Sequence, residues 1–77
     1  MTAVEGQIAE VLLEIIKGKG LATRDLQENT VLDQLGLESL DFAQAVIRME
    51  ELTGKDPFAT GADYQIRTLA DLAVLYI

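Results

Sequence analysis

Apolar side chains recur at helical spacing in three separate stretches of this 77-residue chain, and this periodicity restricts the fold more than any other feature. Spacings of three and four put these side chains on one face of a helix, whereas a half-buried strand needs strict alternation. In the first stretch, Thr2 and Glu5 match the spacing of a capping box. This stretch predicts a helix over residues 2–17, which Gly18 and Gly20 end. Its apolar face consists of Val4, Ile8, Val11, Leu12, Ile15 and Ile16.

The second stretch predicts a helix over residues 39–53, with Gly54 as the residue that ends it. We expect Ser39 to be its N-cap, because a serine hydroxyl there can accept a hydrogen bond from an unpaired N–H of the first turn. The predicted core face consists of Phe42, Ala45, Val46 and Met49. A different face holds Leu40, Ala43 and Ile47, beside Asp41, Glu50 and Glu51. This second face is either a docking surface or a strip that loop residues cover.

The third stretch follows Thr68 and Asp71, which match another capping box and open a last helix that extends through Tyr76. Residues 18–38 follow neither period, so we predict a long loop there, with a helical turn around residues 29–35. Its expected anchors to the core are Leu21, Leu26, Val31, Leu32, Leu35 and Leu37.

The segment between the second and third helices begins with a turn at Pro57, because proline disfavours helical angles in the residue before it. We expect Phe58 to fill the core, one short helical turn within residues 59–67, and Ile66 to point inward. The predicted fold is therefore all-α, a small irregular helical bundle of three main helices plus a short fourth, with a long loop between helices one and two. Residues 1–77 are predicted to form a single domain.

Composition excludes several classes of function. Thirteen acidic and six basic residues give a net charge of −7, which repels nucleic acids and anionic lipid surfaces. Without cysteine and histidine, the chain has no disulfide, no thiolate metal site and no histidine base for an activated serine. Its apolar runs are too short to cross a membrane. We therefore expect a non-catalytic, cytoplasmic monomer.

Other chemistry receives little support from the sequence. Lys17, Lys19 and Lys55 lie beside glycines or in a turn, where burial would not lower the pKa of a lysine. Paired carboxylates such as those of Glu50 and Glu51 would need a walled cleft for acid–base catalysis. For metals, the sequence offers at most a weak acidic site made by Asp33, Glu38 and Asp41.

The start of the second helix is recognisable. Ser39 lies within the run Leu35-Gly36-Leu37-Glu38-Ser39-Leu40-Asp41-Phe42. This run, followed by the pair Glu50-Glu51 and a short C-terminal helix, resembles the acyl carrier protein family over nearly the whole chain. The resemblance implies that Ser39 is esterified with 4′-phosphopantetheine, whose thiol holds acyl groups as thioesters. A phosphate is also electrostatically favoured at a helix N-terminus.

The resemblance also implies partners. These are a phosphopantetheinyl transferase, an acyl-loading ligase or acyltransferase, and a synthase or other acyl-processing enzymes of fatty acid, polyketide or related biosynthesis. The residues that would meet basic, apolar-centred patches on these enzymes are Leu40, Asp41, Ile47, Glu50 and Glu51. Arg48 interrupts this acidic face, either to select partners or simply to pair with Glu50 or Glu51 within the helix.

Some positions depart from the family pattern, and alternatives stay open. Glu38 stands where the family commonly has aspartate, and Gln44 stands where fatty-acid carriers often have glutamate. One alternative is an aminoacyl or peptidyl carrier of nonribosomal peptide synthesis. Another is an unmodified helical interaction module, and a third is a small hydrolase that uses Ser39. For a carrier, we expect the small Ala45 and pliant Met49 to make room for a modest acyl chain within the bundle.

Overall fold

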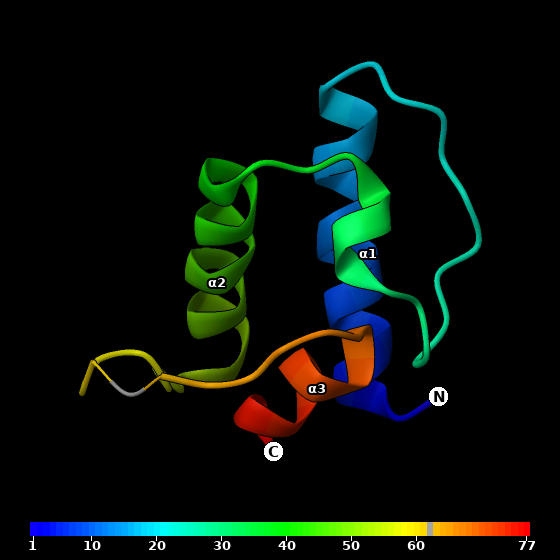
Figure 1. The fold of residues 1–77 in the computed structure, drawn as a ribbon. Coiled ribbons are helices and arrows are strands. Elements are labelled where there is room, and N and C mark those ends of the chain that lie inside the picture. Colours follow the sequence, from blue (N-terminus) through cyan, green and yellow to red (C-terminus); the bar gives the residue numbers. More distant parts are fainter. Residues whose placement is uncertain (62) are drawn as a thin grey trace.

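The computed structural model describes residues 1–61 and 63–77 and shows an all-α fold, as predicted (Figure 1). Its helices are α1 (Ala3–Gly18), α2 (Ser39–Thr53) and α3 (Leu69–Ala73), with two short 3₁₀ helices, η1 (Leu32–Leu35) and η2 (Val74–Tyr76). Among the described residues, the only β-type pairing is one isolated bridge between Val31 and Thr68.

The core lies between α1 and the two helices that pack against it, α2 and α3 (Figure 1). Helix α1 supplies its centre, where Ile8, Leu12 and Ile16 are almost fully buried. Met49 of α2 and Leu69 of α3 complete the most deeply buried set. Because few aromatic residues contribute, close packing of aliphatic side chains supplies most of the hydrophobic stabilisation.

Capping boxes open α1 and α3 as the sequence predicts. At α1, the Thr2 N–H donates to Glu5 Oε1 at 2.7 Å, and the Glu5 N–H donates to Thr2 Oγ1 at 3.1 Å. At α3, the Thr68 N–H donates to Asp71 Oδ2 at 3.0 Å, and the Asp71 N–H donates to Thr68 Oγ1 at 3.2 Å. Backbone hydrogen bonds from Thr68 and then Arg67 hold the pKa of Asp71 below its ordinary value.

The long loop after α1 is anchored at fewer points than expected. Leu26 is buried, and η1 buries Leu32 and Leu35, but Leu21 is exposed and does not reach the core. Three backbone hydrogen bonds instead tie the loop to the start of α3. They join Leu32 N–H to Arg67 O, Leu69 N–H to Thr30 O and Ala70 N–H to Glu28 O, at 2.9, 3.0 and 2.9 Å. These hydrogen bonds fix the path of the loop, which the spacing of its leucines does not predict.

The segment after α2, where one short helical turn was predicted within residues 59–67, forms turns. Turns occupy residues 57–60, and no helix occurs among the described residues of 59–67. Pro57 restricts the backbone here, and Gly61 has a φ of +73°, which a helix does not accommodate. The helical turn between α1 and α2 is η1, within the region predicted for it.

An aromatic contact stabilises the same segment. The rings of Phe58 and Tyr64 meet edge to face, with centroids 5.4 Å apart, and the Tyr64 hydroxyl donates to the carbonyl of Pro57 at 3.0 Å. Phe58 and Ile66 are half-buried and pack against the core; Ile66 points inward as predicted, whereas Phe58 lies at the edge of the core and does not fill it.

We predict that Thr68→Ala lowers the free energy of unfolding by about 1 kcal/mol, because it removes the acceptor for the Asp71 N–H at the start of α3. Chemical denaturation of the purified variant measures this change. Thr23→Ala is the matched control, since Thr23 is exposed in the loop and makes no side-chain hydrogen bond within the described residues. Equal stability of both variants would contradict this account of the cap.

Candidate functional site

Ser39 is the first residue of α2, not its N-cap, which is Glu38. The predicted cap is therefore wrong by one residue. The reason is that Asp41 accepts the Glu38 N–H through Oδ2 at 2.8 Å, which fixes Glu38 as the residue before the helix. Ser39 is exposed, and its hydroxyl makes no hydrogen bond within the described residues. The side chain is consequently free for chemistry at the helix N-terminus.

A tight turn leads the chain into Ser39. Gly36 has a φ of +74°, a left-handed conformation that a residue with a side chain rarely adopts. A Cβ at Gly36 would lie 3.7 Å from Leu21 Cδ1, so space itself is not the constraint. Just upstream, the buried Leu32 and Leu35 of η1 attach this turn to the core. Ser39 is thus presented at the end of an anchored loop.

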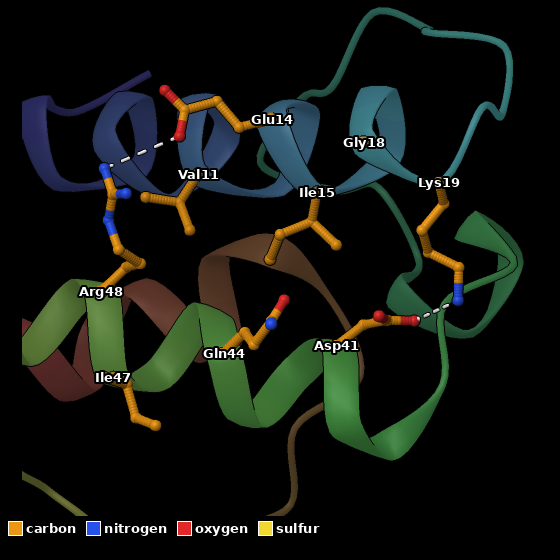
Figure 2. A pocket seen from close by; sticks show the side chains of 9 residues that line it. All are labelled: Val11, Glu14, Ile15, Gly18, Lys19, Asp41, Gln44, Ile47 and Arg48. Atoms are coloured by element: carbon orange, nitrogen blue, oxygen red, sulfur yellow. Dashed lines mark hydrogen bonds and ion pairs between the residues drawn. The ribbon is translucent and has the colours of Figure 1, made fainter.

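Asp41 pairs with Lys19 across the gap between α1 and α2 (Figure 2). Lys19 Nζ lies 2.6 Å from Asp41 Oδ2 and 3.9 Å from Glu38 Oε2. The hydrogen bond from Lys19, and then that from the Glu38 N–H, hold the pKa of Asp41 below 3.8. The same hydrogen bond raises the pKa of Lys19 above 10.5, which keeps this lysine protonated and unsuited to act as a base.

Ser39 is among the residues that line an apolar groove of about 570 Å³ beside α2. It is lined by Leu32, Asp33, Ser39, Phe42, Ala43, Val46, Ile47, Phe58, Ile66 and Leu72. Phe42 and Val46 are half-buried, and Phe42 packs against the core, as expected, while it also lines the groove. Ala45 and Met49, the expected acyl-chain contacts, are buried and do not line the groove. Apolar space is thus available beside Ser39, in the groove that Phe58 also lines.

A second cavity of about 500 Å³ lies between α1 and α2, and Ser39 does not line it (Figure 2). Its walls include Val11 and Ile15 of α1. At one end, Arg48 Nη2 lies 3.6 Å from Glu14 Oε2. Arg48 thus pairs with α1, and the pairing with Glu50 or Glu51 within α2, one of the two alternatives for this residue, does not occur.

The predicted partner-binding residues fall into two groups. Leu40 is 78% exposed and Ile47 is 55% exposed, and Glu50 and Glu51 are exposed as well. Loop residues therefore do not cover Leu40 and Ile47, which excludes the alternative that a loop buries this apolar strip. The side chain of Asp41 is only 14% exposed and is already bound to Lys19.

The structure places two residues at the site that the sequence analysis did not assign to it, Lys19 and Phe58. Lys19 lies 22 positions before Asp41, and no sequence spacing links residues so far apart across a loop. Phe58 was assigned to the core because of its apolar character, which does not distinguish a core position from a groove wall. Only the path of the loop and the turn after α2 brings these residues to Ser39 and its helix.

The described residues form no group of three or more side chains placed to hold a metal ion, so Asp33, Glu38 and Asp41 are not brought together as ligands. No described helix has both the length and the apolar character needed to cross a bilayer. Comparison with family models, with curated proteins and with solved structures finds no match to the chain. The functional interpretation therefore depends on the residues and geometry described above.

We predict that Lys19→Met raises the pKa of Asp41 towards 3.8 without reaching it, because the Glu38 N–H still stabilises the carboxylate. Carboxyl carbon shifts followed by NMR during a pH titration measure this pKa. Since the folded-state pKa is lowered, the Asp41 contacts stabilise the fold above pH 3.8, and their contribution is lost as pH falls through that lowered pKa. An unchanged titration of Asp41 in the variant would show that the ion pair does not persist in solution.

Proposed function

We propose that this protein is a carrier that holds acyl intermediates as thioesters on a 4′-phosphopantetheine arm attached to Ser39. The observation behind the proposal is an exposed serine hydroxyl, without an internal hydrogen bond, at the N-terminus of α2 and at the edge of an apolar groove. Ser39 is also the only serine of the chain. The run of residues around it resembles the acyl carrier protein family, and this resemblance supports phosphopantetheine as the modification.

Loading of the arm is a phosphoryl transfer. The Ser39 oxygen attacks the phosphorus of coenzyme A that bears pantetheine, and the bond from that phosphorus to the bridging diphosphate oxygen breaks. Adenosine 3′,5′-bisphosphate leaves, and the serine proton passes to a base of the phosphopantetheinyl transferase. The base has to come from the transferase, because the Ser39 hydroxyl has no hydrogen-bonded base among the described residues.

The site is chemically suited to the product of this transfer. A phosphodiester on Ser39 bears one negative charge, which the unpaired N–H groups and the helix dipole at the start of α2 favour. The chain has no cysteine, so the thiol that forms the thioester belongs to the arm. The protein positions this thiol and presents its cargo to partner enzymes.

The groove favours acyl cargo over aminoacyl or peptidyl cargo. Its lining is almost entirely apolar, with Asp33 as the one charged residue. Its volume of about 570 Å³ lies within the range typical of small-molecule sites. An apolar chain that enters it is removed from water, and this burial is favourable in proportion to the area covered.

The exposed strip of α2 supports a role in transient binding. Leu40 and Ile47 are apolar and exposed, and the acidic Glu50 and Glu51 lie on the same helix. This combination suits basic, apolar-centred patches on a phosphopantetheinyl transferase, an acyl-loading ligase or acyltransferase, and a synthase. Such contacts are small and weaken with salt, which allows a carrier to leave one partner for the next.

The same exposed strip also favours a second candidate, an unmodified interaction module that binds a partner through Leu40, Ala43 and Ile47. The two functions differ in their need for Ser39. A module binds its partner equally well after Ser39→Ala, whereas a carrier loses its cofactor.

We predict that incubation with coenzyme A and a phosphopantetheinyl transferase adds one phosphopantetheine moiety to the chain, measured as intact mass. Ser39→Ala should gain nothing, because the attacking oxygen is absent, while the control Thr23→Ala should be loaded like the wild type. A wild-type chain that stays unmodified with several such transferases, or a loaded Ser39→Ala variant, would refute the carrier function.

We predict that a medium-length acyl chain on the arm shifts the NMR signals of Phe42, Val46 and Phe58, which line the groove. The signals of Ala45 and Met49 should move less, because these residues are buried in the core and do not line the groove. Comparison of acylated with unacylated carrier measures this difference. Larger shifts at Ala45 and Met49 would place the cargo within the core and contradict the groove.

A further inference from the structure

Lys19 occupies a special position at the end of α1. It is the residue at the C-cap, and its backbone N–H donates to Ile15 O at 3.0 Å, so the last turn of α1 fixes its backbone. Its side chain crosses to α2, where Nζ meets Asp41 (Figure 2). The lysine thus links the end of α1 to the start of the helix that bears Ser39.

One carboxylate oxygen continues this link to the backbone beside the serine. Asp41 Oδ2 accepts from Lys19 Nζ at 2.6 Å and from the Glu38 N–H at 2.8 Å. Glu38 directly precedes Ser39. A charge-assisted hydrogen bond of this length orients the carboxylate, and the carboxylate in turn fixes the peptide that enters Ser39. Two hydrogen bonds therefore connect α1 to the backbone that sets the direction of the serine side chain.

The other ion pair between these helices lacks such a connection. Arg48 and Glu14 are 3.6 Å apart and both are more than half exposed, so their pair contributes little to stability. By contrast, the side chains of Lys19 and Asp41 are 31% and 14% exposed.

We propose that Lys19 is a positioning residue for the loading of Ser39, acting through Asp41 and the Glu38 N–H to fix the backbone from which the serine side chain projects. This inference rests on the proposed function, since it concerns the same serine. Phosphoryl transfer depends on alignment of the attacking oxygen, and a small displacement of that oxygen slows the reaction. On this account Asp41 serves the loading step, and the surface for partners consists of Leu40, Ile47, Glu50 and Glu51.

The test is steady-state kinetics of a phosphopantetheinyl transferase with coenzyme A and four forms of the carrier: wild type, Lys19→Met, Lys19→Arg and Lys17→Met. Lys17 is a charge-matched control, because it lies in the last turn of α1, is exposed and forms no ion pair within the described residues. We expect Lys19→Met to lower kcat by about 3- to 10-fold, with KM unchanged or lower. Lys19→Arg should recover most of kcat, and Lys17→Met should keep the wild-type value.

If Lys19 affected loading only through its contribution to the net charge, the kinetic constants of the variants would follow a different pattern. Removing either lysine would then strengthen attraction to a basic transferase, so KM would fall equally in both variants and kcat would not change. That result overturns the proposal, as does a Lys19→Arg variant as slow as Lys19→Met. Thermal unfolding checks that the variants are folded, and Lys19→Gln replaces Lys19→Met if the latter is not.

Amide hydrogen exchange separates this inference from the proposed function. We expect the Glu38 amide to exchange faster in Lys19→Met than in Lys17→Met, whether or not the chain is ever loaded. If the wild type is loaded but both variants show the same exchange and the same kcat, only the role of Lys19 fails. If the wild type is never loaded, the carrier function fails, and the exchange data alone decide whether the link from Lys19 to Glu38 exists.

Discussion

The structure depends on the burial of one aliphatic face of α1. Both α2 and α3 pack on this helix, and Ile8, Leu12 and Ile16 fill the space between them. In so small a domain, most of the hydrophobic stabilisation has to come from one such cluster. The short α3 is too brief to be stable alone and is held by this contact, by its capping box and by backbone hydrogen bonds to the long loop.

Packing on α1 divides the surface of α2 into parts with different uses. Ala45 and Met49 face the core and are inaccessible, whereas Phe42 and Val46 border the groove beside Ser39. Leu40 remains fully outside. A single amphipathic helix therefore contributes to stability, to a space for apolar cargo and to an exposed strip, because neighbouring elements cover only part of its circumference.

The number of acidic residues in the sequence overstates the negative charge that the surface offers to a partner, because some carboxylates are already paired within the protein. Asp41 counts towards the net charge of −7, yet Lys19 and the Glu38 N–H occupy its carboxylate, and Arg48 pairs with Glu14. Glu50 and Glu51, by contrast, are exposed and form no ion pair within the described residues. On α2, the acidic charges available to a partner are thus fewer than the sequence shows, and those of Glu50 and Glu51 lie in its C-terminal half.

The sequence by itself determined the three helices, the capping boxes of α1 and α3 and the place of Ser39 at the start of α2, since hydrogen bonding and apolar spacing within a few residues decide these features. The N-cap predicted from the sequence was wrong by one residue, because the Asp41 carboxylate accepts the Glu38 N–H and makes Glu38 the residue before the helix. Only the tertiary structure decided that Lys19 reaches Asp41 and that Phe58 walls the groove. Both contacts join residues separated by a loop or a turn, whose path is fixed by hydrogen bonds and burial between distant segments and not by any local pattern.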